Sequence, residues 1–108
     1  MELNVERAAR NEAVFRQANE LIEERLNDLS VVDGRSPFVC ECQDPDCAEI
    51  IRLSLAEYEH VRSNPQWFAI APGHEFVTGA VVQRSERFEV VEKRGKAAEI
   101  AIETDPRA

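Results

Sequence analysis

Residues 38–50, FVCECQDPDCAEI, contain all three cysteines of the chain. Side chains alternate before the turn-forming QDPD, which predicts a strand over 38–42, and a second strand is predicted over 48–53. Side chains at positions i and i+2 of a strand point to one face, so a hairpin returns the third cysteine beside the first two. The stretch therefore predicts a hairpin that gathers three thiols at its closed end.

The C-x-C-x4-C spacing of these thiols favours a metal ion over core packing or redox chemistry. Sulfurs around a tetrahedral zinc ion lie about 3.8 Å apart. Residues two apart in a strand lie about 6.6 Å apart, so we expect the strand to bend at the cysteines. The acidic neighbours Glu41, Asp44 and Asp46 disfavour an activated thiolate and favour a bound cation.

A closed zinc site needs a fourth ligand. His74 follows a Pro-Gly pair in APGHE, and a tight turn of that kind presents a ligand well. The alternatives are His60, Asp44, Asp46, a water molecule or a residue of a second chain. The predicted metal ligands are Cys40, Cys42, Cys47 and His74.

Residues 4–29 have the apolar spacing of a long helix. Its predicted core stripe is Phe15, Ala18, Ile22, Leu26 and Leu29, widened by Val14 and Leu21. The residues predicted to face elsewhere are Arg16, Glu20, Glu23 and Glu24. The turns before Ala13 offer little apolar surface, so we expect them to project, fray or meet a partner; the alternative is a helix that docks on its own domain.

The rest of the chain predicts short elements. Ser54 and Glu57 form a capping box at the start of a short helix, and a strand is predicted over 66–71. A hairpin over 80–93 turns near Ser85, and a last helical turn or two follows. The predicted fold class is α+β: an antiparallel sheet with a long N-terminal helix, a short second helix and a metal-stabilised hairpin.

The predicted organisation is one structural unit, with an amphipathic helix over 1–30 and a small α+β metal-binding domain over 31–108. The chain of 108 residues has a net charge of −8, which disfavours direct binding to nucleic acid. No run approaches the roughly 18 apolar residues of a membrane span. The charged start of the chain does not resemble a signal peptide, so we expect a cytoplasmic protein with reduced thiols.

Several segments of the chain resemble a family of small uncharacterised actinobacterial proteins. They are FVCECQDPDCAEIIRLSLAEYEHVR, WFAIAPGHE, VVQRSERFEVVEK and the helix RNEAVFRQANELIEE. The resemblance implies that the C-x-C-x4-C cysteines and the PGHE histidine belong to one recurring pattern, and it implies no activity. The initial C-x-C also resembles the CDGSH iron–sulfur proteins, which bind a [2Fe–2S] cluster through three cysteines and one histidine. In those proteins the third cysteine lies further along the chain and the ligand histidine follows it closely. Here the third cysteine, Cys47, comes early, and the residue four positions after it is Ile51 and not a histidine.

These observations predict a small non-enzymatic zinc-binding protein that acts as a protein-interaction or regulatory module. Its partner is another protein or a second copy, bound through the N-terminal helix. A thiol-redox or metal sensor is the main alternative, followed by a [2Fe–2S] protein and a metal-dependent enzyme. An enzyme would need an open metal position and a general base, for which Glu41 and Glu75 are the candidates.

Overall fold

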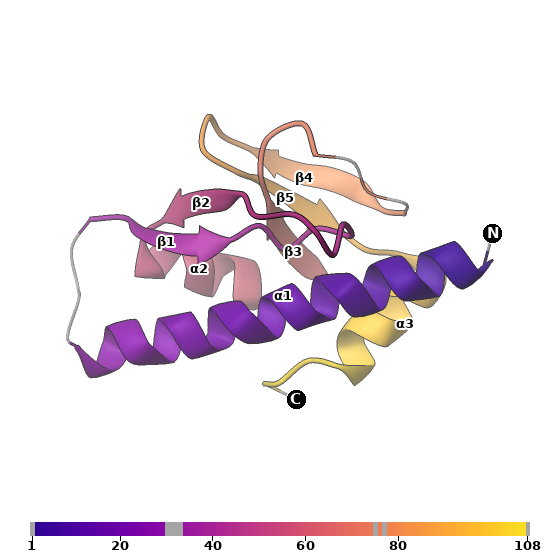
Figure 1. Ribbon diagram of the computed structural model, residues 1–108, viewed down its shortest axis with the longest axis horizontal. Coiled ribbons are helices and arrows are strands. Elements are labelled where there is room, and N and C mark those ends of the chain that lie inside the picture. Colours follow the sequence, from indigo (N-terminus) through magenta and orange to yellow (C-terminus); the bar gives the residue numbers. More distant parts are fainter. Residues whose placement is uncertain (1, 30–33, 75, 77, 108) are drawn as a thin grey trace.

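A long helix, α1 (Glu2–Asp28), runs along one side of the molecule; the strands lie above it, and α3 passes behind it and extends below it (Figure 1). The structure is a computed structural model that describes residues 2–29, 34–74, 76 and 78–107. The predicted boundary between residues 30 and 31 lies outside the described residues, as does Glu75.

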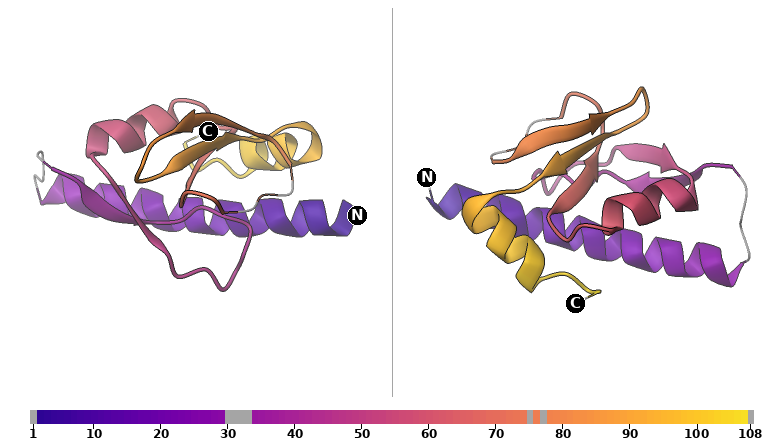
Figure 2. Two further views of the ribbon diagram at one scale, coloured as in Figure 1. Left: turned by 90° about the horizontal axis from the view of Figure 1, so that it is seen from above. Right: turned by 180° about the vertical axis from the view of Figure 1, so that it is seen from behind.

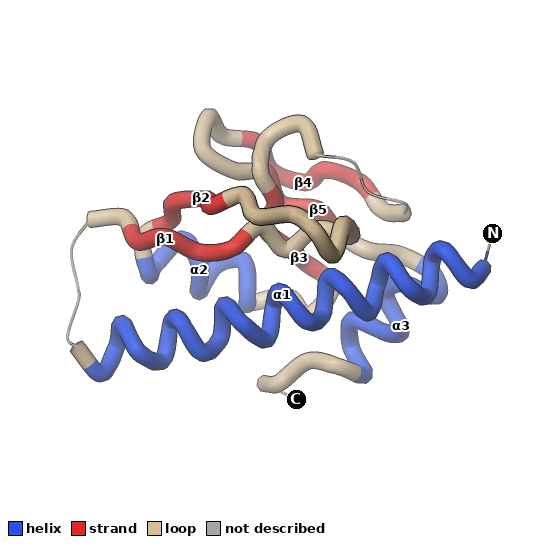
Figure 3. Tube along the Cα trace, in the orientation of Figure 1, coloured by secondary structure: helices blue, strands red, loops and turns tan. Residues whose placement is uncertain are grey.

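The secondary structure confirms the predicted α+β class, with two small antiparallel sheets in place of one (Figure 3). The other helices are α2 (Leu55–Arg62) and α3 (Gly95–Glu103). The strands are β1 (Ser36–Val39), β2 (Ile50–Leu53), β3 (Trp67–Ile70), β4 (Ala80–Arg84) and β5 (Glu89–Glu92). Strands β1 and β2 form one hairpin, and the second sheet has the order β3-β5-β4. No helix in the described part of the chain is long and apolar enough to cross a membrane.

The pairing between the two strands of the cysteine hairpin stops before the cysteines, which is earlier than predicted. Strand β1 ends at Val39 and β2 begins at Ile50, so all three cysteines lie outside the strands. The Cys40 N–H still donates to the Glu49 carbonyl at 3.2 Å, but the Glu41 N–H donates to the Ala69 carbonyl at 2.8 Å. The backbone therefore changes partners at this point, from β2 to the end of β3.

Local signals elsewhere gave correct predictions. Ser54 and Glu57 form both hydrogen bonds of the capping box, at 3.1 and 2.8 Å, and α2 begins at the next residue. The β4–β5 hairpin turns where predicted, because the Ser85 N–H donates to the Phe88 carbonyl at 3.0 Å. Phe88 is 1% exposed and lies in the core, as expected from its inward position.

The main core lies between the hairpin, α2 and the three-stranded sheet. Phe38 of β1 stacks on Tyr58 of α2 with ring centroids 4.6 Å apart. Val90 and Val91 of β5 are fully buried in the same cluster. Ile22 and Leu26 of α1 pack against this cluster, and the remaining buried members include the two cysteines of the C-x-C segment.

The prediction for the buried face of α1 was wrong in part. Val14 and Leu21 are 66% and 58% exposed, and Leu29 is also 58% exposed. Arg16 and Glu23, which were predicted to face elsewhere, are buried. The buried polar residues of this helix are Glu12, Arg16, Asn19 and Glu23, spaced by three or four positions.

The burial of Arg16 has a clear physical reason. Its guanidinium donates to the carbonyls of Pro65 and Ala101, each at 2.7 Å, and lies 4.6 Å from the Phe68 ring centroid. These distant segments give hydrogen-bond acceptors and an aromatic face to a charged group that could not otherwise leave water.

From Val5 onward the N-terminal turns of α1 lie against the rest of the protein, which agrees with the alternative of a docked helix and not with a projecting one. They pack against α3, where Ala9 contacts a small cluster with Ala97, Ile100 and Val5 (Figure 2). Small alanine side chains let two helices approach closely, so little apolar surface is needed for this contact.

Candidate metal centre

The C-x-C segment supplies two buried thiols that point to one side of the backbone. Cys40 and Cys42 are 1% and 2% exposed. The strand ends before both residues, and their Sγ atoms lie within 4.8 Å of each other, as a shared metal ion would require. The Ala71 N–H donates to the Cys40 Sγ at 3.1 Å, which ties this thiol to the residue after β3.

Cys47 lies at the end of the QDPD turn. The Asp44 carboxylate accepts a hydrogen bond from the Asp46 N–H at 2.9 Å, and the Asp44 carbonyl accepts one from the Cys47 N–H at 3.1 Å. This Asx turn reverses the chain over a few residues and returns Cys47 beside the C-x-C segment. Cys47 is partly exposed, unlike the other two cysteines.

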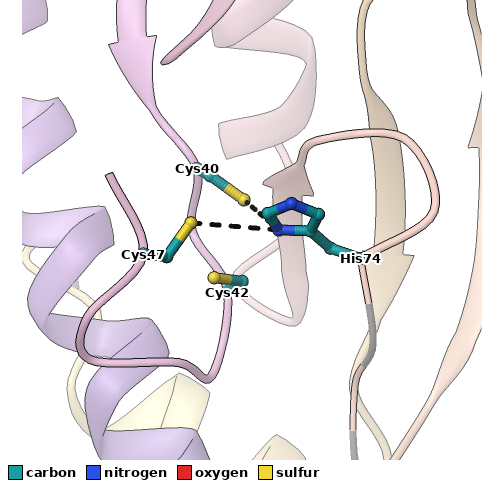
Figure 4. Close-up of side chains that lie close together, drawn as sticks. All are labelled: Cys40, Cys42, Cys47 and His74. Carbon is teal, nitrogen blue, oxygen red and sulfur yellow. Dashed lines mark hydrogen bonds between the residues drawn. The ribbon is translucent and has the colours of Figure 1, made fainter. Parts of the chain in front are cut away.

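His74 is presented by a tight turn after β3. The His74 N–H donates to the Ala71 carbonyl at 3.2 Å, and Gly73 has a φ of +79°. A β-turn with proline second and a positive-φ glycine third has the pattern of type II, in which other residues are disfavoured at the third position. The predicted role of the Pro-Gly pair is therefore matched by the backbone, and the turn directs the imidazole toward the cysteines (Figure 4).

The four predicted ligands converge on one point (Figure 4). Their ligand atoms all lie within 4.8 Å of one another. The His74 Nδ1 lies 3.4 Å from the Cys40 Sγ and 3.9 Å from the Cys47 Sγ. Sulfur and nitrogen ligands of a tetrahedral zinc ion are about 3.5 Å apart. The group therefore could hold a single metal ion after small side-chain shifts.

Burial controls the protonation of the thiols. It raises the pKa of Cys40 and of Cys42, because a thiolate in a poorly hydrated site is disfavoured. The Ala71 N–H opposes this effect at Cys40, since a hydrogen bond to sulfur favours the charged form. A metal cation would supply the missing positive charge and displace the thiol protons, so binding should release protons.

The three alternative ligand residues, His60, Asp44 and Asp46, are not members of the metal-competent group. His60 is exposed on α2, and its ring centroid is 5.4 Å from that of Trp67. Asp44 and Asp46 are exposed on the turn, and the Asp44 carboxylate is engaged by the backbone. Within the described residues, the metal-competent group consists of Cys40, Cys42, Cys47 and His74.

Sequence analysis missed the role of Glu41. This residue is fully buried. Its carboxylate accepts hydrogen bonds from the Asn19 amide at 2.9 Å, the Tyr58 hydroxyl at 2.8 Å and the Ala69 N–H at 2.9 Å. A carboxylate enclosed in this way cannot reach a substrate, so Glu41 is no general base. Only its position between two ligands distinguishes it in the sequence.

One side of the metal-competent group is open. A shallow depression lies beside it, lined by Cys42, Gln43, Asp44, Gly73 and His74.

Comparison with protein-family models, curated protein sequences and solved structures finds no match to this chain. Any function therefore has to be inferred from the site itself.

Proposed function

We propose that the chain is a zinc protein in which Cys40, Cys42, Cys47 and His74 hold one ion in a closed structural site. The observation that carries this proposal is the convergence of four ligand atoms within 4.8 Å of one another. Three thiolates and one imidazole form a ligand set typical of structural zinc, and they leave no tetrahedral position open for a substrate. A non-enzymatic module in the reducing cytosol suits such a site.

The same convergence favours one ion over a [2Fe–2S] cluster. A cluster spreads its ligands over two iron atoms, so ligands of different irons lie further apart than ligands of one ion. Here every pair of ligand atoms lies within the same short distance. A colourless purified protein would support zinc, and visible absorption would support the cluster.

Elemental analysis tests the proposal directly. We expect about one zinc ion per chain in the wild type, and loss of zinc in His74→Ala and Cys47→Ser. His60→Ala is the matched control, because it removes an exposed imidazole outside the group and should leave the zinc content unchanged. Chelation should lower the melting temperature sharply. An unchanged melting temperature after complete metal removal would contradict a structural role.

A thiol-redox or metal sensor is the second candidate. The partial exposure of Cys47 and His74 favours it, because peroxide or a competing chelator can approach from that side. Thiol labelling after mild peroxide treatment separates the two functions. Reversible oxidation with release of zinc supports sensing, whereas resistance supports a closed structural site.

The proposed partner is another protein or a second copy, bound through the outer face of α1. Val14 and Leu21 are exposed on this helix at a spacing of seven residues. Leu21→Lys should weaken any self-association that sedimentation detects.

We also infer that the pattern C-x-C-x4-C followed by P-G-H-E marks a family of actinobacterial zinc proteins. Metal analysis of other proteins with this pattern would test this inference.

A further inference from the structure

Glu41 connects the proposed metal centre to three different elements of the fold. It lies between two of the four predicted ligands, and its side chain is fully buried. The hydrogen-bond donors to its carboxylate belong to Asn19 of α1, Tyr58 of α2 and Ala69 of β3. The C-x-C segment is therefore tied to α1, α2 and β3 through the side chain between its two cysteines.

The contact with β3 also fixes the distance between the two halves of the centre. The Glu41 N–H donates to the Ala69 carbonyl at 2.8 Å, and the Ala69 N–H donates to the Glu41 carboxylate at 2.9 Å. Two residues further along, the Ala71 N–H donates to the Cys40 Sγ, and the turn that carries His74 begins there. Glu41 thus holds the cysteine segment against the strand that leads to the histidine.

The arrangement requires a carboxylate. Its Oε2 accepts two hydrogen bonds and its Oε1 accepts one, and all three partners are donors. A glutamine would place its NH2 group against a donor in either orientation. Asn19 cannot flip to relieve the conflict, because its amide oxygen accepts a hydrogen bond from the Val39 N–H at 2.8 Å.

We propose that Glu41 is the positioning residue of the metal centre, holding the C-x-C segment and the His74 turn at the separation that one tetrahedral ion needs. This inference rests on the proposed zinc function. Residues that orient metal ligands typically change metal affinity about tenfold to a hundredfold when they are replaced. The expected effect of losing the Glu41 carboxylate is a loss in that range.

The experiment is a cobalt(II) titration of the full chain, followed by the visible bands of the tetrahedral ion, with zinc affinity measured by chelator competition. Glu41→Gln should bind zinc about tenfold to a hundredfold more weakly and give a distorted cobalt spectrum at saturation. Glu49→Gln is the matched control, because it makes the same change at an exposed side chain near the centre. It should leave affinity and spectrum unchanged.

A second control separates positioning from general loss of stability. Ile100→Ala removes buried apolar volume from the separate cluster between α1 and α3, and it should lower the free energy of unfolding without altering the cobalt spectrum. If Glu41→Gln does not fold, Tyr58→Phe removes one donor to the carboxylate and should weaken zinc binding several-fold.

The outcomes are distinguishable. Wild-type affinity and spectrum in Glu41→Gln would overturn the positioning role and leave the zinc function intact. An unfolded Glu41→Gln together with unchanged zinc binding in Tyr58→Phe would also overturn it. A wild-type chain that binds neither cobalt nor zinc would overturn the zinc function, and the positioning role with it.

Discussion

The ion pair between Glu12 of α1 and Lys93, which follows β5, permits a quantitative test of the polar interior. The Lys93 Nζ lies 2.5 Å from the Glu12 Oε2, and both side chains are 2% exposed. Lys93 also donates to the Thr78 carbonyl at 3.2 Å and lies 5.4 Å from the Phe76 ring centroid. Lys93→Met keeps most of the side-chain volume but leaves a buried carboxylate without its partner.

Removing one partner of a buried ion pair costs about 3–5 kcal/mol, because the remaining charge stays desolvated and unpaired. We expect Lys93→Met and Glu12→Leu each to destabilise the protein in this range. Replacing both charges with apolar groups of similar volume is often neutral or stabilising. The double variant should therefore be within about 1 kcal/mol of wild type, a strongly non-additive result.

The cost of Lys93→Met should also depend on pH. Burial raises the pKa of Glu12, and the attraction of Lys93 opposes that rise. Without Lys93 the folded-state pKa rises further, so the carboxyl binds a proton more readily in the folded state than in the unfolded state. The stability linked to this proton is present below the unfolded pKa and is lost as pH rises through the folded pKa. The variant should therefore lose more stability at pH 8 than at pH 5.

Urea unfolding followed by far-UV circular dichroism measures these differences. Each variant is compared with wild type at the same pH, so effects common to both proteins cancel. A loss of less than about 1 kcal/mol in the free energy of unfolding for Lys93→Met at pH 8 would refute the buried pair, since a buried charge that loses its partner destabilises the protein by more than that. Additive single and double variants would refute it equally.

Three further predictions concern other parts of the fold. Arg87→Ala should cost only a little stability at pH 7, because water screens its partly exposed ion pair with Glu57. Arg87 lowers the pKa of Glu57 to about 2, so the contribution of this pair to the free energy of unfolding should disappear as pH falls from 4.5 toward 2, and equal costs at pH 7 and pH 2 would contradict it. Gly79→Ala should lower the melting temperature far more than Gly34→Ala. An added Cβ at position 79 would lie 2.2 Å from a backbone carbonyl oxygen of β5, whereas nothing lies within 4 Å of one at position 34. Equal melting temperatures for the two variants would contradict the close contact. Arg16→Lys should cost about 2–3 kcal/mol in urea unfolding, since one ammonium group cannot reproduce the two-pronged guanidinium contact with the carbonyls of Pro65 and Ala101. A cost near zero would count against that geometry.

The parts of the structure that the sequence predicted depend on short-range chemistry. The capping box needs only Ser54 and Glu57, three positions apart, and the turn before His74 needs only a Pro-Gly pair. The cysteine spacing likewise predicted which thiols lie together. In each case the residues that decide the geometry are close in sequence, so their pattern can be read without knowing the fold.

The buried face of α1 could not be predicted in the same way. Apolar periodicity assigns charged residues to the surface, but the hydrogen-bond acceptors of Arg16 are the backbone carbonyls of Pro65 and Ala101, which are far away in the sequence. The early end of β1 has a similar cause. Alternation identifies two faces of an extended segment, and it does not say that the Glu41 backbone leaves one sheet to pair with Ala69 of another.

The location of the four predicted ligands explains what a metal ion would add to this fold. The β1–β2 hairpin and the β3-β5-β4 sheet are separate, and Cys47 and His74 are 27 residues apart along the chain. An ion bound to both would close a loop that contains β2, α2 and β3. The four ligands are held together only in the folded state, so the binding free energy of the ion would add to the free energy of unfolding, and separating the two sheets would require release of the ion. Glu41 lies at the same junction, so its hydrogen bonds and the metal ligands should strengthen one another, and the loss of the Glu41 carboxylate should weaken metal binding without abolishing it.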